Sequence, residues 1–170
     1  PFKHRTTLVH GSLENLRDLA GQSGVTKING LLLDFGVSSP QLDTPERGFS
    51  IRNDGPLDMR MDSSQTTTAA SLLERLKDGE LISIIKNFGE ERFAKKIVRA
   101  IRREQEEKPI ITTSHLSKII SGVVRSPKYS RIHPATKTFQ ALRIAVNNEL
   151  EQIKVVLNDA INLLDASARI

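Results

Sequence analysis

The sequence contains no cysteine. This absence excludes disulfide bonds, thiolate metal ligands and a cysteine nucleophile. The chain also lacks any apolar run near the roughly 18 residues that a membrane-spanning helix needs, and its first residues lack the apolar segment of a signal peptide. Its four histidines share no spacing typical of metal ligands. We therefore expect a soluble intracellular protein with no membrane association and no bound metal.

What is present is typical of a globular protein with one unusually basic segment. Hydrophobic residues make up 38% and charged residues 26% of the 170 positions, which is too polar for a membrane protein. Residues 90–145 hold thirteen Lys and Arg against five Glu, a net charge of +8, whereas the whole chain carries only +5. Such a segment indicates either a polyanionic partner such as RNA or a solvated helical face, and charge alone favours the second interpretation.

The first 33 residues have the strand, helix, strand pattern of an open parallel sheet. Residues 6–10 read as a strand, Ser12 caps a helix that ends near Gly21 and Gly24, and residues 28–33 read as a second strand. The leucine run that closes this second strand lacks the alternation of a half-exposed strand, which predicts burial on both faces. Because only two convincing strands are present, the predicted sheet is incomplete.

The rest of the chain is predicted to be helical after a long irregular segment. Residues 34–62 show no sustained period, and a loop of this length is more often functional than idle. Helices are predicted near residues 68–77, 79–87, 90–107, 113–124 and 135–165. The last carries a stripe of apolar residues at spacings of three and four, which we interpret as helix-bundle core: Phe139, Leu142, Val146, Leu150, Ile153, Leu157, Ala160 and Leu164.

The end of the leucine-rich strand is the first candidate site. Asp34 follows that strand directly, and open α/β sheets bind ligands at the carboxyl ends of their strands. An acid in this position equally often begins a turn. The pair Ser38 and Ser39 has no nearby histidine and no nucleophile-elbow pattern, which argues against a hydrolase. Arg47, Arg52 and Arg60 alternate with acids, so they either hold phosphates or form ion pairs within the loop.

Five blocks carry a specific resemblance: residues 34–43, 46–50, 54–62, 89–94 and 133–144. The first reads Asp-Phe-Gly-Val-Ser-Ser-Pro-Gln-Leu-Asp, and the last begins His-Pro-Ala-Thr-Lys-Thr-Phe-Gln. In this order they resemble the signature blocks of the ribosomal small-subunit methyltransferase H family, also called MraW. The resemblance extends from about Leu8 to about Leu164.

The resemblance implies an α/β fold: a partial Rossmann-like methyltransferase sheet with an inserted, predominantly helical domain. Residues 1–65 would form the partial core with its long active-site loop, residues 66–155 the helical RNA-recognition domain, and residues 156–170 the end of the long helix and a truncated return to the core. The implied cofactor is S-adenosyl-L-methionine, in contact with Asp34 and Gln41. Leu13 stands where family members often carry an aromatic residue beside the cofactor.

The implied reaction is methylation of the exocyclic amine of a cytidine in small-subunit ribosomal RNA. Methyl transfer to an amine needs a positioned nitrogen and a proton acceptor but no covalent adduct, which agrees with the absence of cysteine. Asp34, Ser38 and Ser39 are the candidates for orienting this amine. The candidate RNA-binding residues are Arg47, Arg52, Arg92, Lys95, Lys96, Arg99, Lys137 and Arg143.

The resemblance also indicates what the chain lacks. Family members have a strand and a glycine-rich cofactor loop before the region that begins at Pro1, and further strands after the region that ends at Ile170. Part of the cofactor site is therefore expected to be missing, and the alternative function is that of an inactive fragment that binds RNA or another partner. The resemblance further suggests the bacterial cytoplasm, or the mitochondrial matrix if the source is eukaryotic, and it allows a homodimer.

Overall fold

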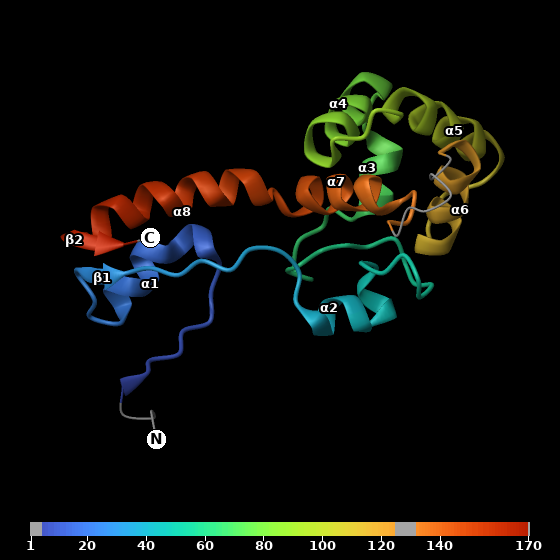
Figure 1. Ribbon diagram of the computed structural model, residues 1–170. Coiled ribbons are helices and arrows are strands. Elements are labelled where there is room, and N and C mark those ends of the chain that lie inside the picture. The colour runs from blue at the N-terminus through green and yellow to red at the C-terminus, as the bar shows by residue number, and fades with distance from the viewer. Residues whose placement is uncertain (1–4, 125–131, 170) are drawn as a thin grey trace. The chain divides into compact units, whose positions relative to one another are not determined.

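The computed structural model describes residues 5–124 and 132–169, which form two compact units. Unit 1 comprises residues 1–36 and 148–170, and unit 2 comprises residues 37–147. Each unit is traced in Figure 1. The loop of residues 37–65 thus belongs to the helical unit, whereas the division by function at residues 65 and 155 stays a prediction.

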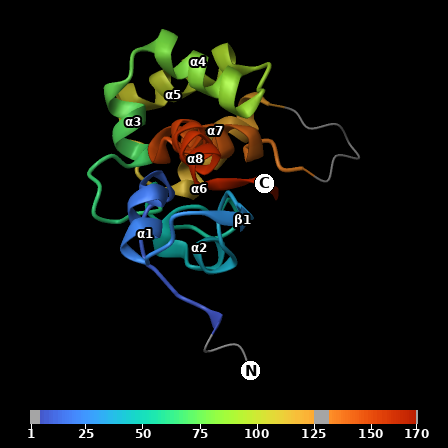
Figure 2. The same ribbon diagram turned by 90° about the vertical axis from the view of Figure 1, so that its left-hand side faces the viewer.

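Unit 1 combines two short strands with helices. It contains the 3-10 turn η2 (Leu13–Asn15), helix α1 (Leu16–Gln22), strand β1 (Ile28–Gly30), helix α8 (Glu149–Leu163) and strand β2 (Leu164–Arg169). The two strands pair in parallel, with Ile28 opposite Leu164 and Gly30 opposite Arg169. Helix α8 contacts both α1 and η2 (Figure 2). Among the described residues of this unit, the buried side chains are those of Val156, Ala160 and Leu163 in α8.

The predicted strands of unit 1 need correction. Residues 6–10 form no strand, because no described segment pairs with them, and Leu8 is 92% exposed. The second strand covers residues 28–30 instead of 28–33. Leu32 is 94% exposed, so the prediction of a strand covered on both faces is wrong for this chain. A parallel strand becomes buried only when neighbouring strands and helices cover it, and the described residues supply one neighbouring strand.

The predicted helix of residues 135–165 is in fact two helices and a strand. Helix α7 (Thr136–Asn147) ends where Asn148 adopts a left-handed conformation, with φ of 50° and ψ of 35°, and α8 begins at the next residue. Asparagine visits this conformation more readily than most residues. The break shifts the buried face, so that Leu150 and Leu157 of the predicted stripe are exposed.

Strand β2 was missed because most of its apolar residues are alanines, which give a weak hydrophobic signal. Leu164, Ala166 and Ala168 alternate with polar residues, which is the period-two signal of a strand. The leucines before it extend the helical spacing and conceal the change of period. Leu164 ends the helix with extended backbone angles, and the β2 backbone then pairs with β1.

Unit 2 is built from helices around one hydrophobic core. Its longer helices are α3 (Ala69–Arg75), α4 (Asp78–Gly89), α5 (Ala94–Glu107), α6 (Thr113–Val123) and α7. Helix α7 packs against α3 and α4, and α5 packs against α4 and α6 (Figure 1). Helices α4 and α7 approach closely at Gly89, where an added Cβ would lie 2.3 Å from the carbonyl oxygen of Lys137. A side chain at this position would therefore force the two helices apart.

Helix α5 begins four residues later than predicted. Glu90 has φ of 51° and ends α4, so it does not begin α5. The buried Glu91 accepts a hydrogen bond from the backbone N–H of Phe93 at 2.7 Å. The prediction that Glu90 and Glu91 occupy the first turn of α5 is therefore wrong, because α4 ends at this pair and α5 begins at Ala94.

The long loop of unit 2 is ordered by its own apolar side chains. Phe49, Leu57 and Met59 are buried in the same core as the helices. The loop also contains the short helix α2 (Ser39–Asp43) and the 3-10 turn η3 (Pro45–Arg47). Gly48 follows with φ of 72°, and a Cβ there would lie 2.2 Å from the carbonyl oxygen of Pro56. The loop is thus part of the folded unit, as expected for a functional loop.

Candidate functional site

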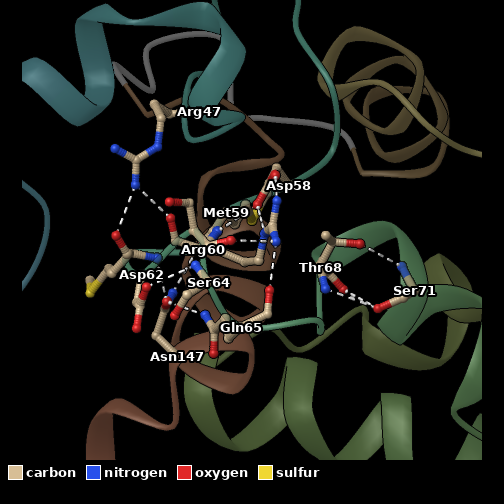
Figure 3. A network of polar contacts seen from close by, with 12 residues as sticks. Arg47, Asp58, Met59, Arg60, Asp62, Ser64, Gln65, Thr68, Ser71 and Asn147 are labelled. Carbon is tan, nitrogen blue, oxygen red and sulfur yellow. Dashed lines mark hydrogen bonds and ion pairs between the residues drawn. The ribbon is translucent and has the colours of Figure 1, made fainter.

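A network of polar contacts fixes the second half of the loop (Figure 3). The guanidinium of Arg60 donates to both carboxylate oxygens of Asp58, each at 2.7 Å, and to the carbonyl oxygens of Ser63 and Gln65. Such a two-point ion pair is among the stronger polar contacts in proteins. For Arg60, the structure therefore favours the internal ion pair over a phosphate contact.

Arg47 joins the same network from the other side of the loop. One of its terminal nitrogens donates to the carbonyl oxygens of Arg60 at 2.8 Å and Met61 at 2.9 Å, and its guanidinium lies 5.9 Å from the ring centre of Phe49. Arg47 thus holds the loop closed. Contact between Arg47 and RNA stays a prediction. Such a contact would use the guanidinium nitrogens other than Nη2, which makes both of these bonds.

The Asp58–Arg60 pair predicts acid sensitivity. The hydrogen bond from Arg60 lowers the pKa of Asp58 below its usual value, although partial burial opposes this effect. The folded protein therefore binds this proton less tightly than the unfolded chain, so the stabilisation is complete at neutral pH and is lost as the pH falls below about 4.

We expect Asp58→Asn to lower the free energy of unfolding at pH 7 by about 1–3 kcal/mol, the range for hydrogen bonds to charged groups. Urea unfolding between pH 7 and pH 3 should show a smaller loss of stability on acidification in the variant than in the wild type. Asp18→Asn is the control, because the exposed Asp18 has no side-chain partner among the described residues. Equal acid slopes for wild type and Asp58→Asn would contradict the prediction.

The predicted cofactor and catalytic residues lie in both units. Leu13 in η2 is 39% exposed, and Asp34 is exposed beyond β1. No hydrogen bond or ion pair to the Asp34 carboxylate occurs within residues 5–124 and 132–169, so this carboxylate can accept from a ligand. Gly36 follows with φ of 111°, a left-handed conformation that suits glycine.

Ser38, Ser39 and Gln41 lie at the start of α2 in unit 2. The side-chain oxygen of Gln41 accepts from the backbone N–H of Ser38 at 2.8 Å and from its hydroxyl at 3.2 Å. The amide nitrogen of Gln41 has no acceptor among the described residues, so Gln41 can act toward a ligand as a donor. Ser39 is exposed, and its hydroxyl has no partner in the described part of the chain.

A hollow that the sequence did not reveal lies beside the end of α2. It has a volume of about 1030 Å³, and its apolar lining consists of Leu42, Phe49, Ile51, Ile132 and Pro134. Polar groups line it as well, among them Asp43, Ser50, Arg52 and His133. Apolar walls with a few polar groups are typical of small-molecule sites. We name this space the α2 hollow.

His133 has a defined role in the α2 hollow. Its Nδ1 accepts a hydrogen bond from the backbone N–H of Ala135 at 3.2 Å, so the neutral ring carries its proton on Nε2. His133 therefore offers a donor to any ligand in the hollow. The block that begins at His133 was recognised from the sequence, but the block alone gave no sign that residues 42–53 would lie opposite it.

The predicted RNA-binding residues divide into engaged and free cations. Lys137 donates to the carbonyl oxygen of Glu90 at 3.0 Å, while Arg92 and Lys96 lie 4.6 and 5.6 Å from the ring centre of Phe93. Arg143 is half-buried in α7 and also has a partner. In the described part of the chain, no group pairs with the side chains of Arg52, Lys95 or Arg99, which are exposed.

Comparison with known proteins identifies the family of the chain. All of residues 1–170 match the MraW methylase family. The chain belongs to this family. The resemblance inferred from the five blocks is thereby confirmed, and membership in the MraW family implies a methyltransferase fold for the small parallel sheet and its helices.

Curated relatives of this MraW segment carry the name "Ribosomal RNA small subunit methyltransferase H". The protein of Trichlorobacter lovleyi is 54% identical over 163 residues, which cover 95% of the chain and 52% of the relative. The protein of Nitrosomonas europaea is 48% identical over 168 residues, or 98% of the chain and 53% of the relative. The chain therefore spans about half the length of the relatives that it matches.

Two further observations concern membranes and metals. No helix that the structure describes has the length and apolar character needed to cross a bilayer. Within residues 5–124 and 132–169 there is no group of three or more His, Asp or Glu side chains suited to hold a metal ion.

Proposed function

We propose that a protein of full family length that carries this chain methylates the exocyclic amine of a cytidine in small-subunit ribosomal RNA. The observation that carries the proposal is the match to the MraW family along all 170 residues, together with an unpaired Asp34 carboxylate at the end of β1. The relatives named as small-subunit ribosomal RNA methyltransferases support the choice of substrate.

The proposed cofactor is S-adenosyl-L-methionine, and the side chains present suit parts of it. The Asp34 carboxylate can accept hydrogen bonds from hydroxyl or amino groups, and the free amide nitrogen of Gln41 can donate to an oxygen or ring nitrogen. The exposed Leu13 offers apolar contact. When bound, the cofactor supplies a methyl group on a positively charged sulfur.

In this proposal the residues of the chain orient the amine and accept its proton. A cytosine amine is a weak nucleophile because its lone pair is shared with the ring, so positioning matters more than activation by a covalent bond. Asp34 is the proton acceptor, and the Ser38 and Ser39 hydroxyls are further acceptors for the N–H groups of the amine. The target base has to leave its stack to reach such a site.

The finer architecture and setting belong to the same proposal. The two parallel strands would be part of a Rossmann-like sheet with residues 66–155 as the inserted RNA-recognition domain. Exposed apolar side chains such as Leu8 and Leu32 suit a unit that further strands and helices cover. Bacterial relatives favour the bacterial cytoplasm as the location, and assembly into a homodimer stays a prediction.

The direct test is methyl transfer by the full-length protein. We expect incubation with small-subunit ribosomal RNA and labelled S-adenosyl-L-methionine to give a labelled N4-methylated cytidine, identified by nuclease digestion and mass spectrometry. Methylation at a ring carbon, or no transfer to RNA, would refute the proposal. For the 170-residue chain alone, we expect RNA binding, but neither micromolar binding of the cofactor nor methyl transfer. Calorimetry that shows micromolar affinity for S-adenosyl-L-methionine would contradict this expectation.

A further inference from the structure

A shallow trough on helix α5 brings together three exposed cations. It lies between α5 and the end of α6, has a volume of about 390 Å³, and is lined by Lys96, Arg99, Ala100, Arg103 and Val123. We name it the α5 trough. Its rim carries three cations and no acid, while its floor is apolar.

The three cations form one face of the helix. At 100° per residue, Lys96, Arg99 and Arg103 fall within about 60° of one another around the axis, and they extend over about 10 Å along it. Lys95 lies about 100° from Lys96 and about 40° from Arg99 around the axis, and it does not line the trough. Arg102 lies on the same side as Lys95, about 20° from it around the axis. It is held by Asp78 at 2.7 Å and by the carbonyl oxygens of Leu73 and Leu76.

No ion pair or side-chain hydrogen bond within the described residues holds the three rim cations in place. Arg99 and Arg103 have no ion pair or hydrogen bond from their side chains in the part of the chain that the structure describes, and Lys96 has only its contact with the ring of Phe93. Arg102, directly before Arg103, is by contrast a structural cation, because its guanidinium bonds to an acid and to backbone carbonyl oxygens. The contrast indicates that the rim cations face an anion outside the unit.

The charges of α5 also run against the helix dipole. Its first turn has no acid and contains Lys95 and Lys96, while its last turn has no base and contains Glu106 and Glu107. Helices favour the opposite arrangement, with acids in the first turn and bases in the last. This distribution reduces the stability of α5, which favours a binding role for its basic half.

We propose that the α5 trough binds the sugar-phosphate backbone of the RNA substrate, with Lys96, Arg99 and Arg103 on consecutive phosphates and Ala100 and Val123 against the riboses. The identity of the anion rests on the proposed function. The lining holds cations but no amide or carboxylate side chain, and such a set suits phosphate oxygens better than the mixed donors and acceptors of base edges. The contact is therefore independent of RNA sequence and positions the substrate.

The test is a salt titration with the 170-residue chain and a short fluorescein-labelled transcript of small-subunit ribosomal RNA. Each lost phosphate contact lowers the slope of log affinity against log salt by about 0.7–0.9. The triple variant Lys96→Ala, Arg99→Ala, Arg103→Ala should therefore show a slope smaller by about 2–3 and an affinity about 100-fold lower at 0.1 M salt.

The control is Lys118→Ala, which removes an exposed cation of α6 that does not line the trough. We expect its affinity to fall less than about threefold, because salt screens charges that are not in contact. Thermal melts followed by circular dichroism should show the triple variant about as stable as the wild type, since the three side chains are exposed and alanine has the highest helix propensity. An equal loss in Lys118→Ala, or an unchanged salt slope in the triple variant, would overturn the proposal.

Two further readouts separate this inference from the proposed function. In the full-length protein, the triple variant should raise the KM for RNA and leave kcat at saturating RNA unchanged. If the wild-type protein binds the transcript with the expected slope but transfers no methyl group, the proposed reaction fails and the trough stands. Equally tight, trough-dependent binding to vesicles of anionic phospholipid would overturn the assignment of RNA as the partner.

Discussion

Replacement of Asp34 by asparagine in the full-length protein is expected to lower kcat for methyl transfer by about 10²–10⁴-fold, the usual contribution of a positioned proton acceptor. Asparagine keeps the size of the side chain but removes its charge and its ability to take up a proton. Asp34 has no internal partner among the described residues, so the substitution breaks no structural contact. The variant should therefore melt at the temperature of the wild type.

The same variant also separates the two roles proposed for Asp34. If the carboxylate only contacts the cofactor, the KM for S-adenosyl-L-methionine rises and kcat at saturation is preserved. If it accepts the proton of the amine, kcat falls, so the rate stays low even at saturating cofactor. Asp18→Asn, an exposed acid of unit 1 with no partner among the described residues, serves as the control. Normal kcat in Asp34→Asn would remove Asp34 from the catalytic step.

Substitution of Asn147 by alanine is expected to destabilise unit 2 strongly. The side chain of Asn147 is buried and bonds to the loop in both directions (Figure 3). Its oxygen accepts from the backbone N–H of Met61 at 2.6 Å and from the side chain of Gln65 at 3.2 Å. Its nitrogen donates to the carbonyl oxygen of Met59 at 2.7 Å and to that of Arg143 at 2.9 Å.

Alanine at position 147 leaves the Met61 N–H and the Met59 carbonyl without these partners in a buried setting. Each unsatisfied buried group costs about 1–3 kcal/mol, so we expect a loss of roughly 3 kcal/mol in the free energy of unfolding, measured by urea denaturation. Asn148→Gly is the neighbouring control. Glycine adopts the left-handed angles of Asn148 without strain, so stability should change by less than about 1 kcal/mol. A loss below about 1 kcal/mol for Asn147→Ala would show that the loop is not anchored by this side chain.

The helices of unit 2 were predictable because their signals are local. Apolar spacings, caps and breakers lie within a few residues of one another, and α3, α4 and α6 begin and end within two residues of the predicted limits. The strands were harder to predict because a strand exists through its neighbour. Residues 6–10 have the composition of a strand but no pairing partner among the described residues, whereas the weakly apolar β2 is a strand because β1 lies beside it.

The candidate site shows the same division. Asp34, Ser38, Ser39 and Gln41 were identified from their order in one block, and the structure adds which of their atoms are free for a ligand. The α2 hollow joins residues 42–53 with residues 132–136, a meeting that no local pattern encodes. The position of Glu90 was misjudged, because two consecutive acids before an apolar run also suit the start of a helix.

The sequence by itself determined the family, the helical character of residues 66–147 and the concentration of positive charge in residues 90–145, since these follow from residue order and local spacing. The tertiary structure decided which charges have a partner. Arg60 and Arg102 bond to groups of the fold, whereas Arg99 and Arg103 line the α5 trough. The local sequence around these four arginines does not reveal this difference. The tertiary structure also decided that the apparent single helix divides at Asn148, beside an Asn147 whose partner Met59 is 88 positions away. Such contacts depend on the chain being folded, because they join residues that only the packing of α7 against the loop brings together.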